Sequence, residues 1–598
     1  MRVLLLVLLA GCAGRAEPVE IVVPAGASAA VPVDAFRAPR RLPDCPQGHV
    51  AVAAACEPAE TAYAAAGGRT FVVDGARGRD DADGSAAHPW RTISRSTGPD
   101  VLRPGDAVLV RQGVYRETVA PREGGSGPDA RVTFAAYPGE AVVISGADPA
   151  DDGWTVAGPG LWRRPWAGPD LPAYGGDDWH FRRPLLVAAG RVLRPVESVR
   201  DLTPGTFTTE GSDDRPTALL ARFAGDASPR AAGPVEIAVR TYGIRPEGAD
   251  PYADCGSEGT PGWLRLVGFT VRHTANRAQW GAVCAGSRGG LVEDVAAEWT
   301  NGAGVDGSGR GHTFRRVRAD HNGQIGWVAR CTDCLFEDSQ AVGNNWKGHD
   351  PFWEAGGGKW NRTTGTTIRR HYAADNDGPG VWLDGDNADN TVEGCRLVGN
   401  QAAGVMLELR TVRTLVQHTH VEGTRWLEWT GTGILSQAAS GNVIVHNTVV
   451  GNEGTGVWLR LDPARRAPDG GTVVANNWIA GNAALASVEA REVSVEAESA
   501  AALRSTQFEG NVYGTVRGDP VLRSRFYASP FGSSGLRSNA LAEWQAVIRG
   551  DERAALALPA RAGRRAAAVP VRAAGAAAAP FVRTRLVGAR PDLVRAAL

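Results

Sequence analysis

Residues 372–408 read YAADNDGPGVWLDGDNADNTVEGCRLVGNQAAGVMLE and contain two copies of one pattern. Each copy runs from a short strand-forming stretch to a turn asparagine, and then through small residues to a second stretch that ends in an acid. The turn asparagines are Asn376 and Asn400, and the closing acids are Asp384 and Glu408. The equal offset in the two copies indicates a repeated structural unit.

Further copies of this pattern occur on both sides, with turn asparagines at Asn322, Asn344, Asn452 and Asn482. Their spacing is about 20–30 residues or roughly twice that, which is typical of solenoid repeats. In one copy, VEGTRWLEW at 421–429, the asparagine is missing. Equivalent asparagines on successive coils can form a hydrogen-bonded ladder. The sequence therefore predicts stacked coils of short β-strands.

Short strands without a helical period favour an all-β solenoid. A β-propeller needs about 40 residues and four strands in each unit, and a sandwich should show more Asn-Gly hairpin turns. We therefore predict a right-handed parallel β-helix with an inserted β subdomain. The chain has 598 residues and a net charge of −1, so no global basic field favours nucleic acid as a partner.

The N-terminal residues MRVLLLVLLAGC resemble a bacterial lipoprotein signal, in which the cysteine, here Cys12, is lipidated after cleavage. We expect lipid anchoring in the bacterial cell envelope, at the outer membrane or cell surface, with membrane contact through the anchor only. The expected segments are a signal peptide at 1–12, a tether with a Cys45–Cys56 staple at 13–68, N-terminal β-helix coils at 69–147, an inserted β subdomain at 148–240, the main parallel β-helix at 241–500, a C-terminal cap at 501–560 and an Ala/Arg-rich tail at 561–598.

The chain contains eight cysteines, and export permits disulfides. Cys45 and Cys56 are expected to form a bridge before the main domain. Without the lipidated Cys12 the number of cysteines is odd, so at least one thiol should be unpaired. Cys331 and Cys334 have the spacing of a redox pair, but no βαβ pattern surrounds them, which favours a structural role.

The repeat also predicts which side chains stack on neighbouring coils. Asp384 and Glu408 lie at the same offset from their turn asparagines and follow apolar strands, so they should point the same way, about 4.8 Å apart along the axis. Two carboxylates at that distance repel each other when both are charged, so the pKa of one should rise. The acid with the raised pKa then suits the role of general acid, and the other suits that of nucleophile or base. The alternative is a solvated face on which Arg410 and Arg460 balance the charges.

The coil before this pair is longer and reads NWKGHDPFWEAGGGKW at 345–360. It holds both lysines of the chain, Lys347 and Lys359, in a sequence that otherwise uses arginine. A compact amine that can lose its proton makes Lys359 a candidate catalytic group, and Glu354 is another. The candidates for sugar binding are Trp346, Trp353, Trp360, Trp382, Asp386 and Arg410. The alternative is a loop that covers the core with aromatic side chains.

An acidic cluster in the same region has oxygen ligands that suit Ca²⁺. The candidate metal ligands are Asp375, Asp377 and Asp386, although their spacing is not that of an EF-hand. The nearby histidines lack zinc-ligand spacing, so structural roles are expected for most of them.

The segments WEAGGGK (353–359), NDGPGVWLD (376–384) and GVMLE (404–408) resemble secreted bacterial right-handed β-helix proteins of the pectate-lyase-like superfamily that are related to glycoside hydrolases. One such family contains β-xylosidases with an Asp nucleophile in a Trp-Leu-Asp strand and a Glu acid/base one coil later. The resemblance implies that Asp384 is the nucleophile and Glu408 the acid/base.

Three functions are open, and each has a polysaccharide or oligosaccharide as its partner. A retaining glycoside hydrolase without a cofactor is favoured, because stacked side chains fit the ~5–5.5 Å carboxyl separation of retaining enzymes better than the ~6.5–9.5 Å of inverting ones. The alternative is a Ca²⁺-dependent polysaccharide lyase with Lys359 as base, since residues 69–147 resemble the N-terminal coils of such lyases. The third is a non-catalytic glycan-binding surface protein.

Overall fold

The computed structural model describes residues 55–461 except 172–178, 213–214 and 249–254, and before them residues 18–22, 45 and 49–52. Beyond residue 461 it describes mainly strands, namely 472–475, 477–480, 482, 493–497, 506–509, 511–514, 526–530, 536–538, 555–556 and 583–587. Cys12 and the expected signal peptide lie outside the described residues. The chain divides into two compact units, Pro39–Gly358 and Lys359–Leu598 together with Met1–Ala38.

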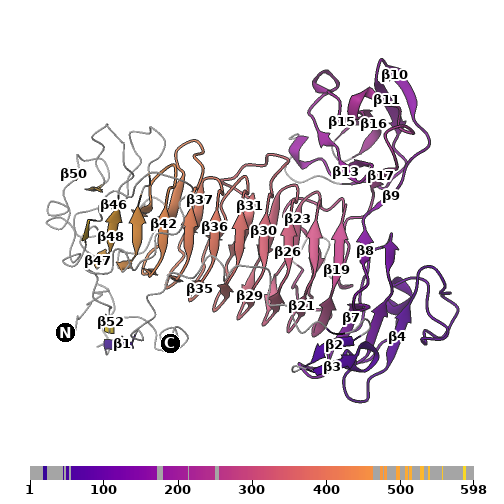
Figure 1. Cartoon of the computed structure of the whole chain (residues 1–598), viewed down its shortest axis with the longest axis horizontal. Coiled ribbons are helices and arrows are strands. Elements are labelled where there is room, and N and C mark those ends of the chain that lie inside the picture. Colours follow the sequence, from indigo (N-terminus) through magenta and orange to yellow (C-terminus); the bar gives the residue numbers. More distant parts are fainter. Residues whose placement is uncertain are drawn as a thin grey trace. The chain divides into compact units, whose positions relative to one another are not determined.

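The unit Pro39–Gly358 is built mainly of coils whose strands pair in parallel with the equivalent strands of the next coil (Figure 1). One of its sheets consists of β4 (Thr70–Val73), β5 (Ala107–Val110), β7 (Val132–Ala136), β18 (Leu264–Val267), β21 (Leu291–Glu293), β25 (Thr313–Arg315) and β29 (Leu335–Glu337). The second consists of β6 (Gly113–Tyr115), β8 (Val142–Ser145), β19 (Phe269–Arg272), β22 (Ala296–Glu298), β26 (Arg318–Asp320) and β30 (Gln340–Val342). The third contains β20 (Gly281–Cys284), β23 (Ala303–Asp306) and β27 (Ile325–Ala329).

Aromatic side chains fill the inside of these coils. Phe314 and Phe336 occupy the same register position on β25 and β29 and stack with ring centroids 4.9 Å apart. Trp327 meets both rings edge-on at 5.5 Å. All three side chains are fully buried, so each coil contributes apolar surface to one continuous core.

The inserted residues form two antiparallel sheets, which Figure 1 shows apart from the coils of the same unit. One contains β9 (Ala147–Pro149), β17 (Val235–Ala238), β12 (Leu186–Ala188) and β13 (Arg191–Val192). The other contains β10 (Thr155–Gly158), β11 (Leu161–Pro165), β16 (Pro216–Arg222), β15 (Thr206–Gly211) and β14 (Arg194–Pro195), of which β14 and β15 pair in parallel. Phe207 and Phe223 are buried between them, and Trp154 packs edge-on against Phe223 at 5.3 Å.

Lys347 fastens this insertion to the coils of its own unit. The side chain is 2% exposed, and its Nζ donates to Arg182 O at 2.6 Å and to Asn301 Oδ1 at 2.8 Å. An ammonium group that is buried this deeply needs such acceptors. One of the two lysines in the unusual coil is therefore a structural residue.

Smaller elements complete the unit. They are the β2 (His49–Val52) and β3 (Ala55–Pro58) hairpin, helix α1 (Ala59–Ala62), the 3-10 turns η2 (Ser94–Thr97), η3 (Trp179–Phe181), η4 (Val199–Asp201) and η5 (Ala224–Asp226), and the strand pair β24 (Gly309–Arg310) and β28 (Cys331–Thr332). Among the described residues, no helix is long and apolar enough to cross a membrane.

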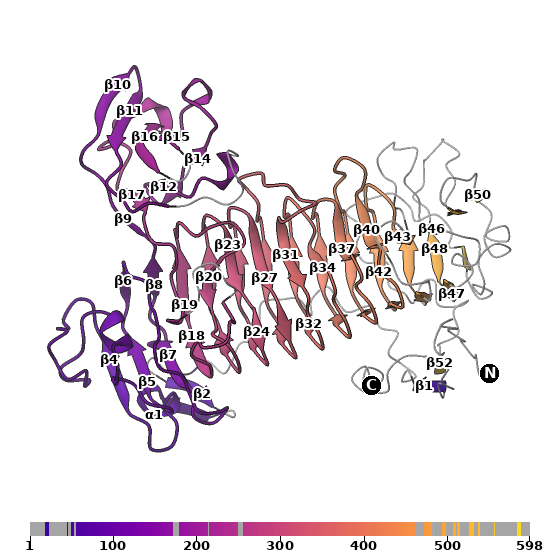
Figure 2. The same ribbon diagram turned by 180° about the vertical axis from the view of Figure 1, so that it is seen from behind.

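The unit Lys359–Leu598 repeats the three-sheet coil (Figure 2). Its first sheet contains β32 (Thr367–Arg369), β35 (Thr391–Glu393), β38 (Leu415–Gln417), β41 (Val443–Val445), β44 (Val473–Ala475) and β47 (Gln507–Glu509). Its second contains β33 (Tyr372–Ala374), β36 (Arg396–Val398), β39 (His420–Glu422), β42 (Thr448–Val450), β45 (Trp478–Ala480), β48 (Val512–Gly514) and β51 (Ala555–Leu556). The parallel β-helix predicted from the sequence is confirmed.

The third sheet of this unit carries the candidate site. It runs from the end of β31 (Gly356–Asn361) through β34 (Val381–Asp384), β37 (Ala403–Glu408), β40 (Thr432–Gln437), β43 (Val457–Leu461), β46 (Val493–Ala497) and β49 (Phe526–Pro530) to β50 (Leu536–Ser538), which pairs antiparallel with β49. Parallel pairing thus continues into the range for which we expected a cap. In the range of the expected tail, β52 (Arg583–Val587) pairs antiparallel with β1 (Pro18–Val22).

The turn asparagines form the predicted ladder. The Nδ2 of Asn376 donates to Asn400 Oδ1 at 2.8 Å, and the Nδ2 of Asn452 donates to Asn482 Oδ1 at 2.7 Å. In the coil that lacks the asparagine, Thr424 takes its position, and its backbone N–H donates to Asn452 Oδ1 at 2.9 Å. A second ladder, which the sequence analysis missed, runs through Asn447, Asn477 and Asn511.

Disulfides join Cys45 to Cys56, Cys255 to Cys284 and Cys331 to Cys334, and Cys395 is a buried free thiol. The first bridge and the unpaired thiol agree with the expectations from the sequence. Burial raises the pKa of the Cys395 thiol to about 12, so this thiol is unreactive at neutral pH.

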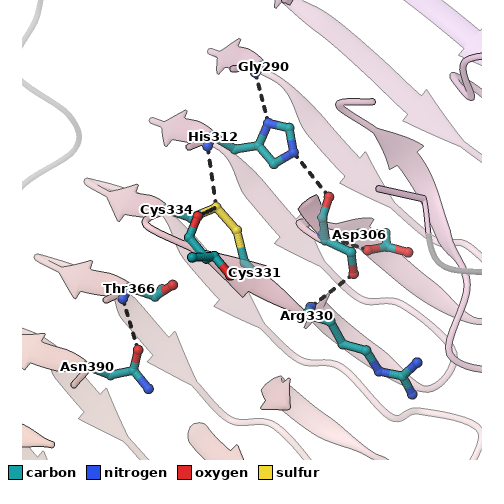
Figure 3. Close-up of a disulfide and its surroundings, with 10 residues drawn as sticks. Gly290, Asp306, His312, Arg330, Cys331, Cys334, Thr366 and Asn390 are labelled. Carbon is teal, nitrogen blue, oxygen red and sulfur yellow. Dashed lines mark hydrogen bonds between the residues drawn. A yellow bond between two sulfur atoms is a disulfide. The ribbon is translucent and has the colours of Figure 1, made fainter. Parts of the chain in front are cut away.

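Figure 3 shows His312 beside the Cys331–Cys334 disulfide, where its backbone N–H donates to Cys334 Sγ at 3.3 Å. The His312 ring accepts a hydrogen bond from Gly290 N at 2.8 Å and faces Ser308 O at 3.1 Å. Burial lowers the pKa of His312 to about 4, so the imidazole is neutral at physiological pH.

The ladder generates a stability prediction. Asn400→Ala removes the acceptor of Asn376 and the donor that bonds Ala373 O at 2.8 Å. Buried groups without partners cost about 1–3 kcal/mol each, so the urea midpoint of the variant should fall clearly. Thr155→Ala at an exposed position is the control. Equal midpoints for both variants would contradict the structural role of the ladder.

The pKa of His312 generates a pH prediction. Histidine in the unfolded chain titrates near 6.5, so the contribution of neutral His312 is complete above that pH and is lost as pH falls toward 4. The loss amounts to about 3 kcal/mol between pH 7 and pH 4. Urea unfolding at these two pH values measures it. His312→Gln should shrink the difference, whereas the exposed His88→Gln should leave it unchanged; the same difference in all three proteins would refute the assignment.

Candidate functional site

The two predicted acids occupy equivalent positions on adjacent coils. Leu383 on β34 pairs with Leu407 on β37, so the next residues, Asp384 and Glu408, end their strands at the same register position. Both leucines are fully buried. Successive side chains of a strand point to opposite faces, which places both acids on the face opposite to the leucines. Figure 2 shows β34 and β37 next to each other.

Lys359 belongs to the site through Asp384. Its Nζ lies 2.9 Å from Asp384 Oδ2, and the two side chains are 13% and 11% exposed. The same Nζ lies 4.1 Å from the centroid of the Trp382 ring. An ammonium group over an indole face is favoured by the quadrupole of the ring. The other oxygen of Asp384, Oδ1, is buried and makes no hydrogen bond with any described residue.

Glu408 has a different environment. Trp382 Nε1 donates to Glu408 Oε2 at 3.1 Å, and Gln437 Nε2 donates to Oε1 at 3.4 Å. Glu408 is 5% exposed. Trp382 and Gln437 thus orient Glu408, whereas Lys359 orients Asp384. Trp382 connects the two acids, because one indole contacts Lys359 with its face and Glu408 with its N–H.

The tryptophans predicted to stack on sugars lie in different environments. Trp382 is 1% exposed and packs with Met406 and Leu435, and Trp360 is fully buried. Neither ring offers an open face on which a sugar could stack. Trp360 pairs in register with the core residue Leu383, whereas Trp382 lies on the opposite face of its strand and is covered there by Met406 and Leu435. A sequence motif alone does not reveal this cover.

The remaining candidates from the unusual coil belong to the other unit, Pro39–Gly358. Trp353 is 50% exposed, whereas Trp346 is half-buried and donates from Nε1 to His321 O at 2.8 Å. Glu354 is 1% exposed and accepts a hydrogen bond from Gln279 Nε2. Its burial and its hydrogen bond to Gln279 give Glu354 a structural role in this unit.

The candidate calcium ligands are not brought together. Asp386 pairs with Arg410 on the surface, and Asp377 pairs with Arg425 at 2.8 Å. The Arg410 guanidinium beside Asp386 lowers the pKa of that carboxyl below its usual value. In the described part of the chain no group of three or more His, Cys, Asp or Glu side chains, Asp375 included, is placed to hold a metal ion.

The structure adds residues that the sequence analysis missed. Trp429 and Trp458 pack against the cluster of Trp382, Met406 and Leu435. Trp429 comes from the loop 424–431 in the coil without the asparagine. Arg425 of this loop holds it to earlier coils through hydrogen bonds to Gly399 O and Asn376 O. In the sequence, the two tryptophans of the segment VEGTRWLEW are the signal that could have pointed to Trp429.

Comparisons with known proteins agree with this architecture. The family model "Right handed beta helix region" matches residues 267–479. The structure of XylC in complex with xylose is similar with a TM-score of 0.57 and 17% identity, over 74% of this chain and 83% of XylC. No curated protein sequence matches the chain.

Two further structures match with TM-scores of 0.42. One is a glycoside hydrolase with 13% identity, over 75% of this chain and 97% of that chain. The other is the A-module of the mannuronan C-5 epimerase AlgE6 from Azotobacter vinelandii, with 14% identity over 76% of this chain and 91% of that chain. At 17% identity the likeness to XylC shows the fold alone. The predicted relation to right-handed β-helix proteins is therefore confirmed for the fold.

Proposed function

We propose that this chain acts on a polysaccharide or oligosaccharide as a retaining glycoside hydrolase. The observation that carries the proposal is the pair of nearly buried carboxyl groups, Asp384 and Glu408, at one register position of adjacent coils. A pair of carboxyl groups is what most glycoside hydrolases use to cleave the glycosidic bond. Xylose bound to XylC, which has the same fold, supports a sugar as the ligand.

Asp384 is suited to be the nucleophile. Lys359 pairs with Oδ2 and compensates the negative charge, while Oδ1 has no hydrogen-bond partner among the described residues. This oxygen is available to attack the anomeric carbon as the bond to the leaving group breaks, which produces a glycosyl ester on Asp384. Lys359 acts on the reaction by holding the carboxylate in place.

Glu408 is suited to be the acid/base. In the first step its carboxylic acid proton moves to the glycosidic oxygen, so that the leaving group departs as an alcohol. In the second step the carboxylate takes a proton from water, and the water oxygen attacks the anomeric carbon and releases Asp384. Trp382 and Gln437 fix the orientation of Glu408 for both transfers.

The lyase alternative has less support from the geometry. Its base would be Lys359, but the Nζ of this residue pairs with Asp384 and lies over the Trp382 ring. Its calcium ligands would be Asp375, Asp377 and Asp386, two of which pair with arginines instead.

The proposal predicts the effect of two substitutions on hydrolysis. Asp384→Asn and Glu408→Gln should each lower kcat/KM by about 10²–10⁴-fold. Release of reducing ends from neutral and uronic polysaccharides and from aryl glycosides measures this. Asp294→Asn, which removes a carboxylate that pairs with Arg316 on the surface of the other unit, is the control and should retain activity. Full activity in Glu408→Gln, or unsaturated products, would contradict the mechanism.

We also propose that Cys12 carries a lipid anchor, because it ends the lipoprotein-like signal MRVLLLVLLAGC. The full chain expressed in a bacterium should then incorporate labelled palmitate and sediment with membranes. Cys12→Ser should lose the label and become soluble. Equal labelling of both proteins would overturn this proposal without affecting the catalytic one.

A further inference from the structure

The strand that carries Asp384 has a second copy in the same unit. Residues 380–384 read GVWLD and residues 456–460 read GVWLR, so Arg460 stands where the first copy has its nucleophile. One coil after Arg460 the register places Glu496, just as Glu408 is one coil after Asp384. The second copy therefore repeats the candidate site with a cation in place of an acid.

The hydrogen-bonding groups of the second copy lack the partners that the first copy has. Trp382 Nε1 donates to Glu408, but Trp458 Nε1 is a buried atom without a hydrogen bond to any described residue. The same is true of Arg460 Nε, which lies 3.7 Å from Glu496 Oε2, too far for a hydrogen bond.

An acceptor lies beside these donors. Gln437 pairs with Arg460 in register, is 4% exposed, and its Oε1 has no donor within the described part of the chain. Two donors and one acceptor without a hydrogen bond to any described residue thus occur on neighbouring coils, and Arg460 keeps a longer ion pair with Glu496. Buried polar atoms of this kind are costly unless a ligand or water supplies the missing bonds.

Aromatic rings border these groups. Trp429 and Trp458 meet edge-on at 5.8 Å, and the Arg460 guanidinium lies 5.9 Å from the Trp429 ring centroid. Both tryptophans and the arginine are half-buried, so part of each faces solvent. Ligand sites combine apolar walls with a few polar groups in this way.

The second copy lies on the same parallel sheet as the acid pair. Arg460 follows Glu408 by two strands of one parallel sheet, β40 and β43. Two strand spacings amount to about 10 Å along the coils. A sugar chain that extends from the acid pair along this sheet meets Gln437 first and Arg460 next.

We propose that Gln437, Trp458 and Arg460 form a subsite for a sugar residue that carries an anionic group, either a carboxylate or a sulfate. This inference rests on the proposed function, because it places the subsite on the glycan that Asp384 and Glu408 cleave. The guanidinium binds two oxygens of the anion, as arginine does with carboxylates and with tetrahedral oxyanions such as phosphate. Trp458 N–H donates to another ligand oxygen, and Gln437 Oε1 accepts a sugar hydroxyl.

The test is a comparison of binding to matched oligosaccharides. Calorimetry on the Glu408→Gln protein would use neutral, uronate-bearing and sulfated tetramers from the gluco, galacto, manno and xylo series. In at least one series the acidic member should bind 10-fold or more tightly than the neutral member. The uronate and sulfate arms separate the two sources of negative charge.

Two substitutions in the same background identify the residues responsible. Arg460→Gln should abolish the preference for the acidic member, and Trp458→Phe, which keeps the ring and removes the N–H, should weaken binding several-fold. Arg413→Gln, a half-buried arginine paired with Asp389 in the same unit, is the matched control and should keep the preference.

The inference is overturned if no series shows an acidic preference, or if Arg460→Gln retains it. Circular dichroism of each variant excludes loss of the fold as the cause. Hydrolysis assays of the Asp384 and Glu408 variants are independent of this outcome, so failure of the subsite and failure of the catalytic proposal are distinguishable.

Discussion

The fixed register of the parallel coils is the constraint on which the candidate site depends. Asp384 and Glu408 are neighbours only because Leu383 pairs with Leu407. A slip by one residue would turn both acids toward the core and both leucines outward. The buried asparagine ladder opposes such a slip, because each amide bonds the equivalent residue of the next coil. Thr424 keeps one backbone bond of the ladder where the asparagine is absent.

Within that register, Trp382 links the groups of the site. Its ring face contacts the Lys359 ammonium and its N–H bonds Glu408, while Lys359 pairs with Asp384. The two acids are therefore connected through one side chain, Trp382. Lys359 pairs with Asp384, whereas Trp382 and Gln437 donate to Glu408, so each acid has its own donors and their roles in catalysis can differ.

The periodic part of the structure could be predicted from the sequence. Asparagine spacing predicts the coils, and equal offsets from Asn376 and Asn400 place Asp384 and Glu408 together. Side-chain environments that depend on distant segments could not be predicted. The sequence gives no sign that Trp382 and Trp360 are buried, that Gln279 bonds Glu354, or that Trp429 packs beside Trp382. These contacts join residues whose relation is set by the fold rather than by the repeat.

Trapping the covalent intermediate tests the central claim most directly. A 2-deoxy-2-fluoro glycoside with a good leaving group forms the glycosyl ester quickly and loses it slowly, because the fluorine destabilises both oxocarbenium-like transition states. Peptide mass spectrometry should then find the sugar on Asp384 in the wild-type protein. Label on another residue, or a first-formed product with inverted anomeric configuration, would contradict Asp384 as the nucleophile of a retaining hydrolase.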